Sequence, residues 1–290
     1  MQRSTGTWAL AVHGGAKEIA PDEEAANRDG VDRALAAGRN VLAYGGSAVA
    51  AVEAAVRMLE DDPTFNAGSG SVPNSAGEIE MCAALMEGSD LSIGAVGIIR
   101  GVRNPVTVAR MLMDEPTILL AGDGARNFAR LRGAELWDPS EPSSERELAF
   151  ADHDTVGAVA LDLDGTFAAA TSTGGLSDTR PGRMGDSALP GCGYYADNAV
   201  GAVALSGDGE AIARLTCAAS IMHSMHALGP TEALRRTLEQ LPKLDGDGGG
   251  IAIAADGTIG WWHNSPHFAV GVASGADPDG AVWLAKDEAG

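Results

Sequence analysis

One junction in the chain combines the groups that an amide hydrolase needs. Thr155 follows an acidic, Pro- and Ser-rich segment and begins a buried apolar run, in the sequence His153-Asp-Thr-Val-Gly157. By itself this threonine is an ordinary strand residue, because its branched Cβ suits a strand. If the Asp154–Thr155 bond is cut, the new α-amine has a reference pKa of about 7.7–8.0 and can act as a general base. Base and nucleophile then share one residue, without a histidine.

Other signatures of nucleophiles and metal sites are weak in the sequence. There is no Gly-x-Ser-x-Gly elbow and no Ser-x-x-Lys. His223 and His226 lie three apart in a predicted helix and could form a metal pair, but a half-exposed helix surface explains them better. His263 and His267 flank a predicted turn beside two tryptophans, where packing and loop polarity account for them.

The predicted elements place Thr155 at the start of a β-hairpin. The runs 155–162 and 166–172 flank an Asp-Gly turn, which is typical of two paired strands. Helix pairs in both halves, with strands between them, predict an α+β fold in which helices cover two packed sheets. The polar stretch 134–150 is predicted to be a linker. The other predicted strands are 8–16, short strands separated by tight loops within 65–100, 199–206 and the hairpin 251–262. The predicted helices are 22–41, 47–63, 105–113, 124–132, 210–227 and 231–241.

Composition and charge exclude several classes of protein. The 290 residues carry 20 Lys plus Arg against 40 Asp plus Glu, a net charge of −20. Such a chain is a poor partner for nucleic acid or anionic membranes, because phosphate binding needs clustered cations. No run approaches the ~18–20 apolar residues that span a bilayer, and no signal peptide is apparent, so we expect a cytoplasmic protein. Three cysteines without a close pair predict neither a disulfide framework nor a zinc site.

Several motifs occur in the same order as in one known family. The second half contains Thr155-Val-Gly-Ala-Val-Ala-Leu-Asp162, Thr171-Ser-Thr-Gly-Gly175, Gly182-Arg-Met-Gly-Asp-Ser187 and Ser206-Gly-Asp-Gly-Glu210. The first half contains Val12-His-Gly-Gly-Ala16, Gly45-Gly-Ser-Ala-Val-Ala-Ala-Val-Glu-Ala-Ala55 and Leu59-Glu-Asp-Asp-Pro-Thr-Phe-Asn-Ala-Gly68. Together they resemble the plant-type L-asparaginase and isoaspartyl peptidase family of N-terminal nucleophile hydrolases, which has glycosylasparaginase relatives.

The resemblance implies one domain over residues 1–290 with a four-layer αββα sandwich, cleaved by its own chemistry into 1–154 and 155–290. The Thr155 hydroxyl attacks the preceding carbonyl during maturation and a substrate amide afterwards, through a β-aspartyl ester. It also implies no cofactor for catalysis, a small-molecule or dipeptide substrate with a β-linked L-aspartyl group, and a homodimer of cleaved units.

The resemblance also implies roles for the residues around the nucleophile. Thr173 supports the Thr155 hydroxyl, and Ser206 and Gly207 donate to the oxyanion. Arg183 holds the substrate α-carboxylate with its planar fork. Asp186 holds the α-ammonium, and Gly209 completes the substrate-binding set. Two simpler interpretations remain open: Arg183 and Asp186 could pair with each other, and residues 206–209 could be only a strand-to-helix turn.

The loop after the second predicted helix resembles the sodium-binding loop of the family. Its ligands are mostly backbone carbonyls, which impose little on side-chain identity, so an ion-free loop is the alternative. The expected ligands of this structural sodium ion are Leu59, Glu60, Asp62, Phe65, Ala67 and Ser69.

Three departures from the family pattern concern cleavage rate and substrate choice. Cys82 stands where the family usually has an aspartate, and Glu87 replaces another aspartate. Ser206 replaces a threonine, which keeps the hydroxyl and loses a methyl group.

The leading hypothesis for the function is hydrolysis of isoaspartyl peptides and L-asparagine. The alternatives are a glycosylasparaginase, suggested by the 153–157 junction and by Ile93-Gly-Ala-Val-Gly97, and an uncleaved, non-catalytic family member.

Overall fold

Two β-sheets form the centre of the protein. The computed structural model describes residues 7–137 and 155–289, so that Asp154 and most of the predicted linker lie outside the described residues. The larger sheet has the strand order β12-β11-β1-β5-β6-β2-β3-β4, in which only β3 and β4 are parallel within the described part of the chain. Its strands are β1 (Ala9–Lys17), β2 (Met81–Glu87), β3 (Ile93–Ile99), β4 (Leu119–Ala121), β5 (Val156–Leu161), β6 (Phe167–Thr173), β11 (His267–Ser274) and β12 (Ala281–Trp283).

The smaller sheet has the strand order β10-β9-β8-β7 and is antiparallel throughout. Its strands are β7 (Tyr194–Asp197), β8 (Gly201–Gly207), β9 (Gly248–Ala254) and β10 (Ile259–His263). The helices are α1 (Glu24–Ala43), α2 (Ala48–Glu60), α3 (Pro105–Leu112), α4 (Gly122–Leu131), α5 (Gly209–Leu215), α6 (Cys217–Leu228) and α7 (Pro230–Leu238).

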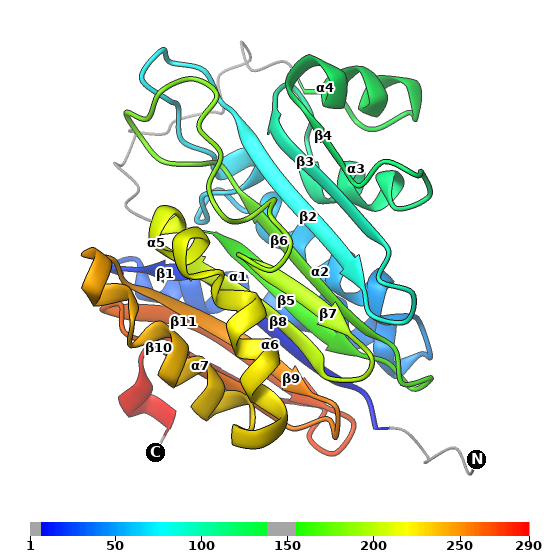
Figure 1. The fold of residues 1–290 in the computed structure, drawn as a ribbon, viewed down its shortest axis with the longest axis vertical. Helices are drawn as coiled ribbons and strands as arrows, with labels where there is room; N and C mark the ends of the chain where they lie inside the picture. Colours follow the sequence, from blue (N-terminus) through cyan, green and yellow to red (C-terminus); the bar gives the residue numbers. More distant parts are fainter. Residues whose placement is uncertain (1–6, 138–154, 290) are drawn as a thin grey trace.

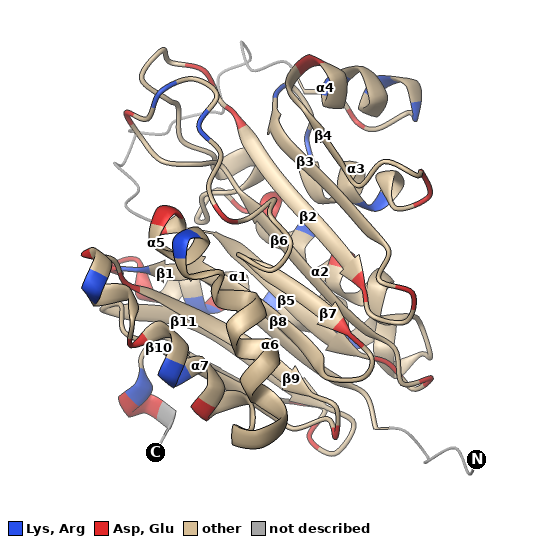
Figure 2. Cartoon of the chain, in the orientation of Figure 1, with Lys and Arg blue, Asp and Glu red and all other residues tan. Residues whose placement is uncertain are grey.

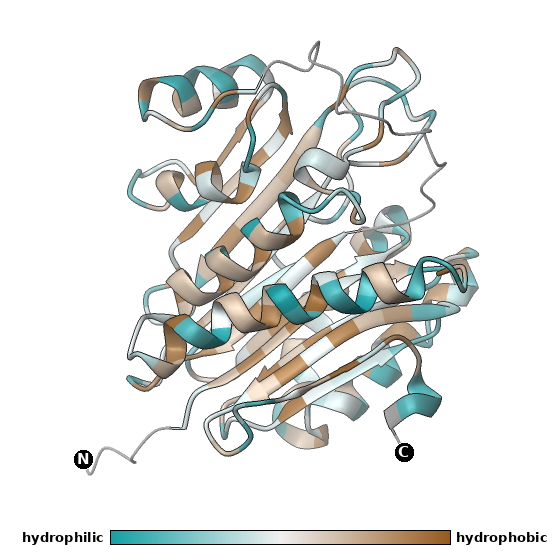
Figure 3. Cartoon of the chain, turned by 180° about the vertical axis from the view of Figure 1, so that it is seen from behind, coloured by the Kyte–Doolittle hydropathy of each residue, from teal (hydrophilic) through white to brown (hydrophobic). Residues whose placement is uncertain are grey.

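Helices lie on the outer side of each sheet. Helices α1 and α2 cross the larger sheet and contact its central strands, as the view from behind shows (Figure 3). Helices α6 and α7 cover the smaller sheet on the opposite side of the molecule (Figure 1). Strands β1, β5 and β6 of the larger sheet in turn contact β8 and β9 of the smaller one. The predicted α+β class with sheet on sheet is therefore confirmed.

Alternating side chains of the central strands fill two cores. In β1, Leu10 and Val12 pack toward the helices, whereas Ala9 and Ala11 pack between the sheets. Strand β6 shows the same period of two, with Ala168 and Ala170 on the helix side. Because both faces of these strands are buried, they read as almost continuous apolar runs. Charged residues lie mainly on helices and loops (Figure 2).

The structure corrects one predicted helix and adds strands that the sequence did not reveal. The helix predicted over 210–227 is two helices, α5 and α6, separated at Thr216, whose φ of +46° is left-handed and interrupts the helix. Strands β4, β7, β11 and β12 were not predicted; β4, β7 and β12 have only three or four residues, too few for a clear period. No helix in the described residues has the length and apolarity needed to cross a membrane.

Candidate active site

Thr155 lies directly before β5, where the two sheets meet. Its side chain and backbone are almost fully buried, with 6% exposure. Its N–H donates to Ser206 Oγ at 3.2 Å, and its Oγ1 lies 3.2 Å from Ser187 Oγ. Ser206 belongs to β8 of the smaller sheet, so the contact joins both sheets at the residue that is predicted to be the nucleophile.

The Ser206 hydroxyl accepts two backbone hydrogen bonds. One comes from Thr155 and the other from the N–H of Ala16 at 3.0 Å. A hydroxyl has two lone pairs and one proton, so both lone pairs are engaged and the proton remains available for a third group. The next residue, Gly207, has φ +143°, and a Cβ there would lie 2.3 Å from the Asp247 carbonyl oxygen. Only glycine fits this position, which turns the backbone toward α5.

Thr173 ends β6 beside Thr155, the predicted nucleophile. The antiparallel register pairs Val156 with Ser172, which brings Thr155 and Thr173 to opposing positions of neighbouring strands. Thr173 is 6% exposed, and its Oγ1 accepts a hydrogen bond from the N–H of Gly175 at 3.2 Å. On its other side it pairs with Cys82 of β2. Burial raises the pKa of the Cys82 thiol to about 11, so a neutral thiol occupies the position where an aspartate was expected.

Among the described residues, His13 is the histidine that lies closest to Thr155 in the fold, and it is a weak base at neutral pH. His13 is fully buried in β1, with its ring stacked on Phe268 at 5.3 Å between ring centres. Its Nε2 lies only 2.4 Å from where a Cβ on Gly157 would be. Burial lowers the pKa of His13 to about 3, although the Thr155 backbone acts in the opposite direction. A base this weak does not accept a proton from a hydroxyl at neutral pH.

Arg183, Asp186 and Gly209 converge on one small space. A Cβ on Gly209 would lie 2.8 Å from Asp186 Oδ1 and 3.1 Å from Arg183 Nη2. Asp186 is 3% exposed, and its Oδ2 has no hydrogen-bond partner among the described residues. Burial raises the pKa of Asp186 to about 7, while Arg183 acts in the opposite direction. A buried carboxylate oxygen without a partner is a site for a cation such as an ammonium group.

Arg183 pairs with Glu210 and not with Asp186. Its Nε donates to Glu210 Oε1 at 2.9 Å and its Nη2 to Oε2 at 2.5 Å, a bidentate geometry. The interpretation in which Arg183 and Asp186 merely pair with each other is therefore wrong.

The sequence analysis missed both Glu210 and Ser187 as neighbours of predicted site residues. The available signal for Glu210 was an acid at the start of a predicted helix, directly after the predicted oxyanion residues.

Replacing Gly209 by alanine should weaken substrate binding. The added methyl group would enter the space between Arg183 and Asp186 and come within 3 Å of a carboxylate oxygen. We expect KM for a β-aspartyl substrate to rise by roughly 10- to 100-fold, about 1.4–2.8 kcal/mol, because one recognition group must shift. Steady-state kinetics on cleaved protein measure this. Gly124→Ala on α4 is the matched control, since a Cβ there meets nothing within 4 Å. An unchanged KM for Gly209→Ala would contradict the placement of the substrate between these residues.

Replacing Asp186 by asparagine should stabilise the protein at neutral pH while it removes activity. Between its ordinary pKa of 3.8 and its folded value of about 7, the unfolded chain releases the proton that the folded chain keeps. The free energy of unfolding therefore falls as pH rises through this window. We expect Asp186→Asn to lack this decline and to be more stable by about 1–4 kcal/mol at pH 8. The measurement is urea unfolding from pH 4 to 8 of two proteins, one with Asp186 and one with Asp186→Asn, each carrying Thr155→Ala to prevent cleavage. If the free energies of unfolding of the two proteins changed with pH in parallel, the prediction would be contradicted.

The predicted sodium loop is tied together through its own carbonyl oxygens. A carbonyl oxygen has two lone pairs, and each of these oxygens uses one of them in a hydrogen bond within its own loop. The Glu60 side chain instead reaches β6, where its Oε1 accepts from Ser172 Oγ at 2.7 Å. Among the described residues, no three His, Cys, Asp or Glu side chains gather to hold a metal. The carbonyls of Leu59, Glu60, Asp62, Phe65 and Ala67 accept from Asp62 N, Ser69 Oγ, Phe65 N, Ala67 N and Gly70 N, respectively.

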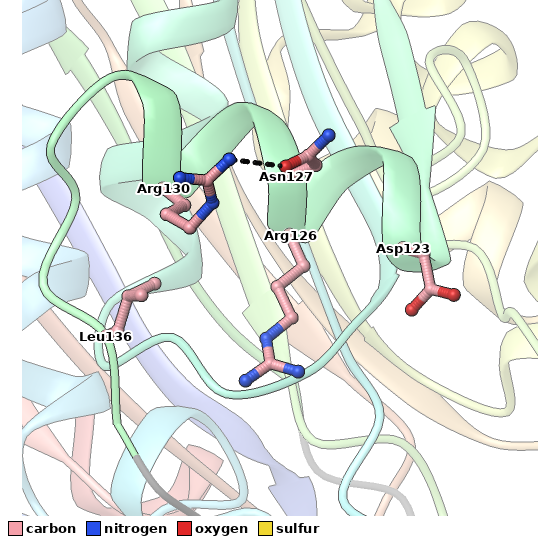
Figure 4. Close-up of a pocket in the computed structure, with 5 residues that line it drawn as sticks. All are labelled: Asp123, Arg126, Asn127, Arg130 and Leu136. Atoms are coloured by element: carbon pink, nitrogen blue, oxygen red, sulfur yellow. Dashed lines mark hydrogen bonds between the residues drawn. The ribbon is translucent and has the colours of Figure 1, made fainter.

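A surface pocket of about 350 Å³ lies on α4, away from the predicted site residues. None of those residues lines it, so it has no part in the chemistry considered above. Figure 4 shows Arg126 and Arg130 of α4 at this pocket, and Arg130 Nη2 donates to Asn127 Oδ1 at 3.1 Å. The lining residues are Asp123, Arg126, Asn127, Arg130 and Leu136.

Comparisons with known proteins show the family to which the chain belongs. A family model described as Asparaginase matches residues 6–150 and 141–280. The chain is 41% identical to an isoaspartyl peptidase/L-asparaginase of Bos taurus, over 90% of this chain and 92% of the relative. It is 44% identical to the protein of the same description from Xenopus laevis, over 84% of each chain. It is 40% identical to an isoaspartyl peptidase of Escherichia coli strain K12, over 88% and 89%. Since both the family model and these relatives cover most of the chain, it belongs to the asparaginase family that includes them.

Proposed function

We propose that the chain is a self-cleaving threonine hydrolase that acts on β-aspartyl peptides and L-asparagine. The observation that carries the proposal is the buried Thr155, whose N–H and hydroxyl both contact serine hydroxyls. The names of the relatives, isoaspartyl peptidase and L-asparaginase, support the substrate class. In the mature protein the Thr155 α-amine takes the hydroxyl proton, and Oγ1 bonds to the substrate amide carbon. Ser206 and Gly207 donate to the oxyanion. The C–N bond then breaks, the leaving amine takes the proton, and water hydrolyses the ester.

Recognition of the substrate uses the other half of the site. The α-ammonium of the aspartyl group approaches the unpartnered Oδ2 of Asp186, and the α-carboxylate approaches the Arg183 guanidinium. Glu210 already holds that guanidinium, so the substrate carboxylate shares it or replaces Glu210. Glu210 is exposed, whereas Arg183 is largely buried, which makes displacement toward solvent feasible.

The wider architecture follows from the same proposal. The two sheets and their outer helices form a four-layer αββα sandwich, a single domain over 1–290 that is cut into 1–154 and 155–290. We propose that the loop carbonyls from Leu59 to Ala67, with Ser69, hold a structural sodium ion, and that the cleaved units form a cytoplasmic homodimer.

A comparison of three substrates tests the proposal. Cleaved protein is incubated with an isoaspartyl dipeptide, with L-asparagine and with N-acetylglucosaminyl-asparagine, and product release is followed for each. We expect hydrolysis of the first two. Preferred release of the sugar amine would instead assign a glycosylasparaginase, and the absence of hydrolysis for all three would contradict the proposal.

A further inference from the structure

Ser187 is the residue whose side chain lies against the predicted nucleophilic oxygen. Its Oγ is 3.2 Å from Thr155 Oγ1, and the residue is 2% exposed. Its backbone carbonyl accepts a hydrogen bond from Thr171 Oγ1 at 2.7 Å. Thr171 lies in β6, which pairs directly with β5 after Thr155. The Ser187 backbone is thus fixed to the strand beside the nucleophile.

The hydroxyl of Ser187 has no other use in the described part of the chain. Thr155 Oγ1 is its single hydrogen-bond partner among the described residues. Buried hydroxyls are usually hydrogen-bonded, and within the described residues this one bonds only to the atom that must become a nucleophile. Ser206, by contrast, serves the nitrogen of Thr155. Two serines therefore flank the two reacting atoms of one residue.

We propose that Ser187 is a further catalytic residue, which donates its hydroxyl proton in a hydrogen bond to Thr155 Oγ1. The inference rests on the proposed function, in which the Thr155 proton passes to its own amine. Because that proton is committed to the amine, Thr155 cannot also donate it to Ser187, and Ser187 must be the donor. The bond holds the oxygen in place and stabilises the negative charge that grows on it during attack. Ser187 itself keeps its proton throughout.

The test is the substitution Ser187→Ala. We expect kcat per cleaved chain to fall by about 10- to 100-fold, because a donor to a charged oxygen is lost. KM should change by less than about twofold, because the Ser187 hydroxyl bonds to Thr155 and not to Arg183 or Asp186, which are proposed to hold the substrate. Ser265→Ala is the control, since Ser265 is also buried but donates to the His267 carbonyl. It should leave kcat unchanged.

Two further variants make the result decisive if Ser187→Ala is not cleaved or does not fold. Thr171→Val keeps the Ser187 hydroxyl but removes the anchor of its carbonyl, and it should lower kcat, whereas Thr171→Ser should restore it. Wild-type kcat in cleaved Ser187→Ala would overturn the role of Ser187. If Ser187→Ala gives no cleaved protein, wild-type kcat in Thr171→Val would do the same. A wild-type protein that hydrolyses no substrate would overturn the proposed function instead, so the two failures are distinguishable.

Discussion

Replacing Thr155 by alanine is expected to leave a single uncleaved chain without hydrolytic activity. The alanine lacks the hydroxyl that attacks the preceding carbonyl, so that no α-amine is released and no ester can form. We expect activity to fall by at least about 10⁴-fold, to the background of the assay. A denaturing gel after long incubation and the substrate assay measure the two effects separately.

Thr155→Ser is the matched control for this substitution. It keeps the hydroxyl and, once cleaved, the α-amine, but it loses the methyl group that restricts χ1. We therefore expect a slower enzyme that still matures. Thr155→Ala with retained hydrolysis would show that another residue is the nucleophile. The buried N–H contact to Ser206 does not depend on the side chain at 155, so a folding defect is not expected to explain the loss.

Replacing Arg183 by alanine is expected to have the second largest effect. The substrate α-carboxylate would lose a bidentate, charge-assisted partner in a largely buried place. We expect kcat/KM to fall by about 10²- to 10³-fold, and Arg183→Lys to recover only part of it, because a lysine has the charge without the planar fork. Steady-state kinetics with an isoaspartyl dipeptide measure both variants.

Two controls separate the loss of the guanidinium from other effects. Arg235→Lys changes an arginine of α7 that also pairs with two glutamates, and it should leave the kinetics unchanged. Glu210→Gln breaks the pair with Arg183 but keeps the guanidinium, so kcat/KM should change far less than in Arg183→Ala. A wild-type kcat/KM in Arg183→Ala would contradict the assignment of the substrate carboxylate.

Local signals in the sequence were sufficient for most of the fold. The Asp-Gly turn between two apolar runs identified the hairpin of β5 and β6, and Ser47 accepts from the N–H of Ala50 at 3.2 Å as a helix cap. The break between α5 and α6 at Thr216 was missed, because the left-handed backbone of a single threonine does not interrupt the periodic spacing of apolar residues in the sequence. Strand β11 pairs with β1 from the far end of the chain, a partnership that no local pattern reveals.

The candidate site was predictable only in part. The junction marked Thr155 as a candidate, whereas its role as nucleophile and the roles of Arg183 and Asp186 were predicted from the resemblance to a family. The partners Glu210 and Ser187 lie 27 and 32 positions from Arg183 and Thr155, so their contacts arise only when loops and strands are folded together. The spacing of apolar residues along the chain predicts helices and strands well, but it does not predict which loop residues come into contact in the fold.

The intact mass of the purified protein is the most direct test of the central claim. Self-cleavage before Thr155 predicts two chains, residues 1–154 and residues 155–290, with Thr155 as the first residue of the second. A single chain of 290 residues that hydrolyses an isoaspartyl dipeptide, or a cut at any other bond in active protein, would contradict the claim that a freed Thr155 amine and hydroxyl carry out the reaction.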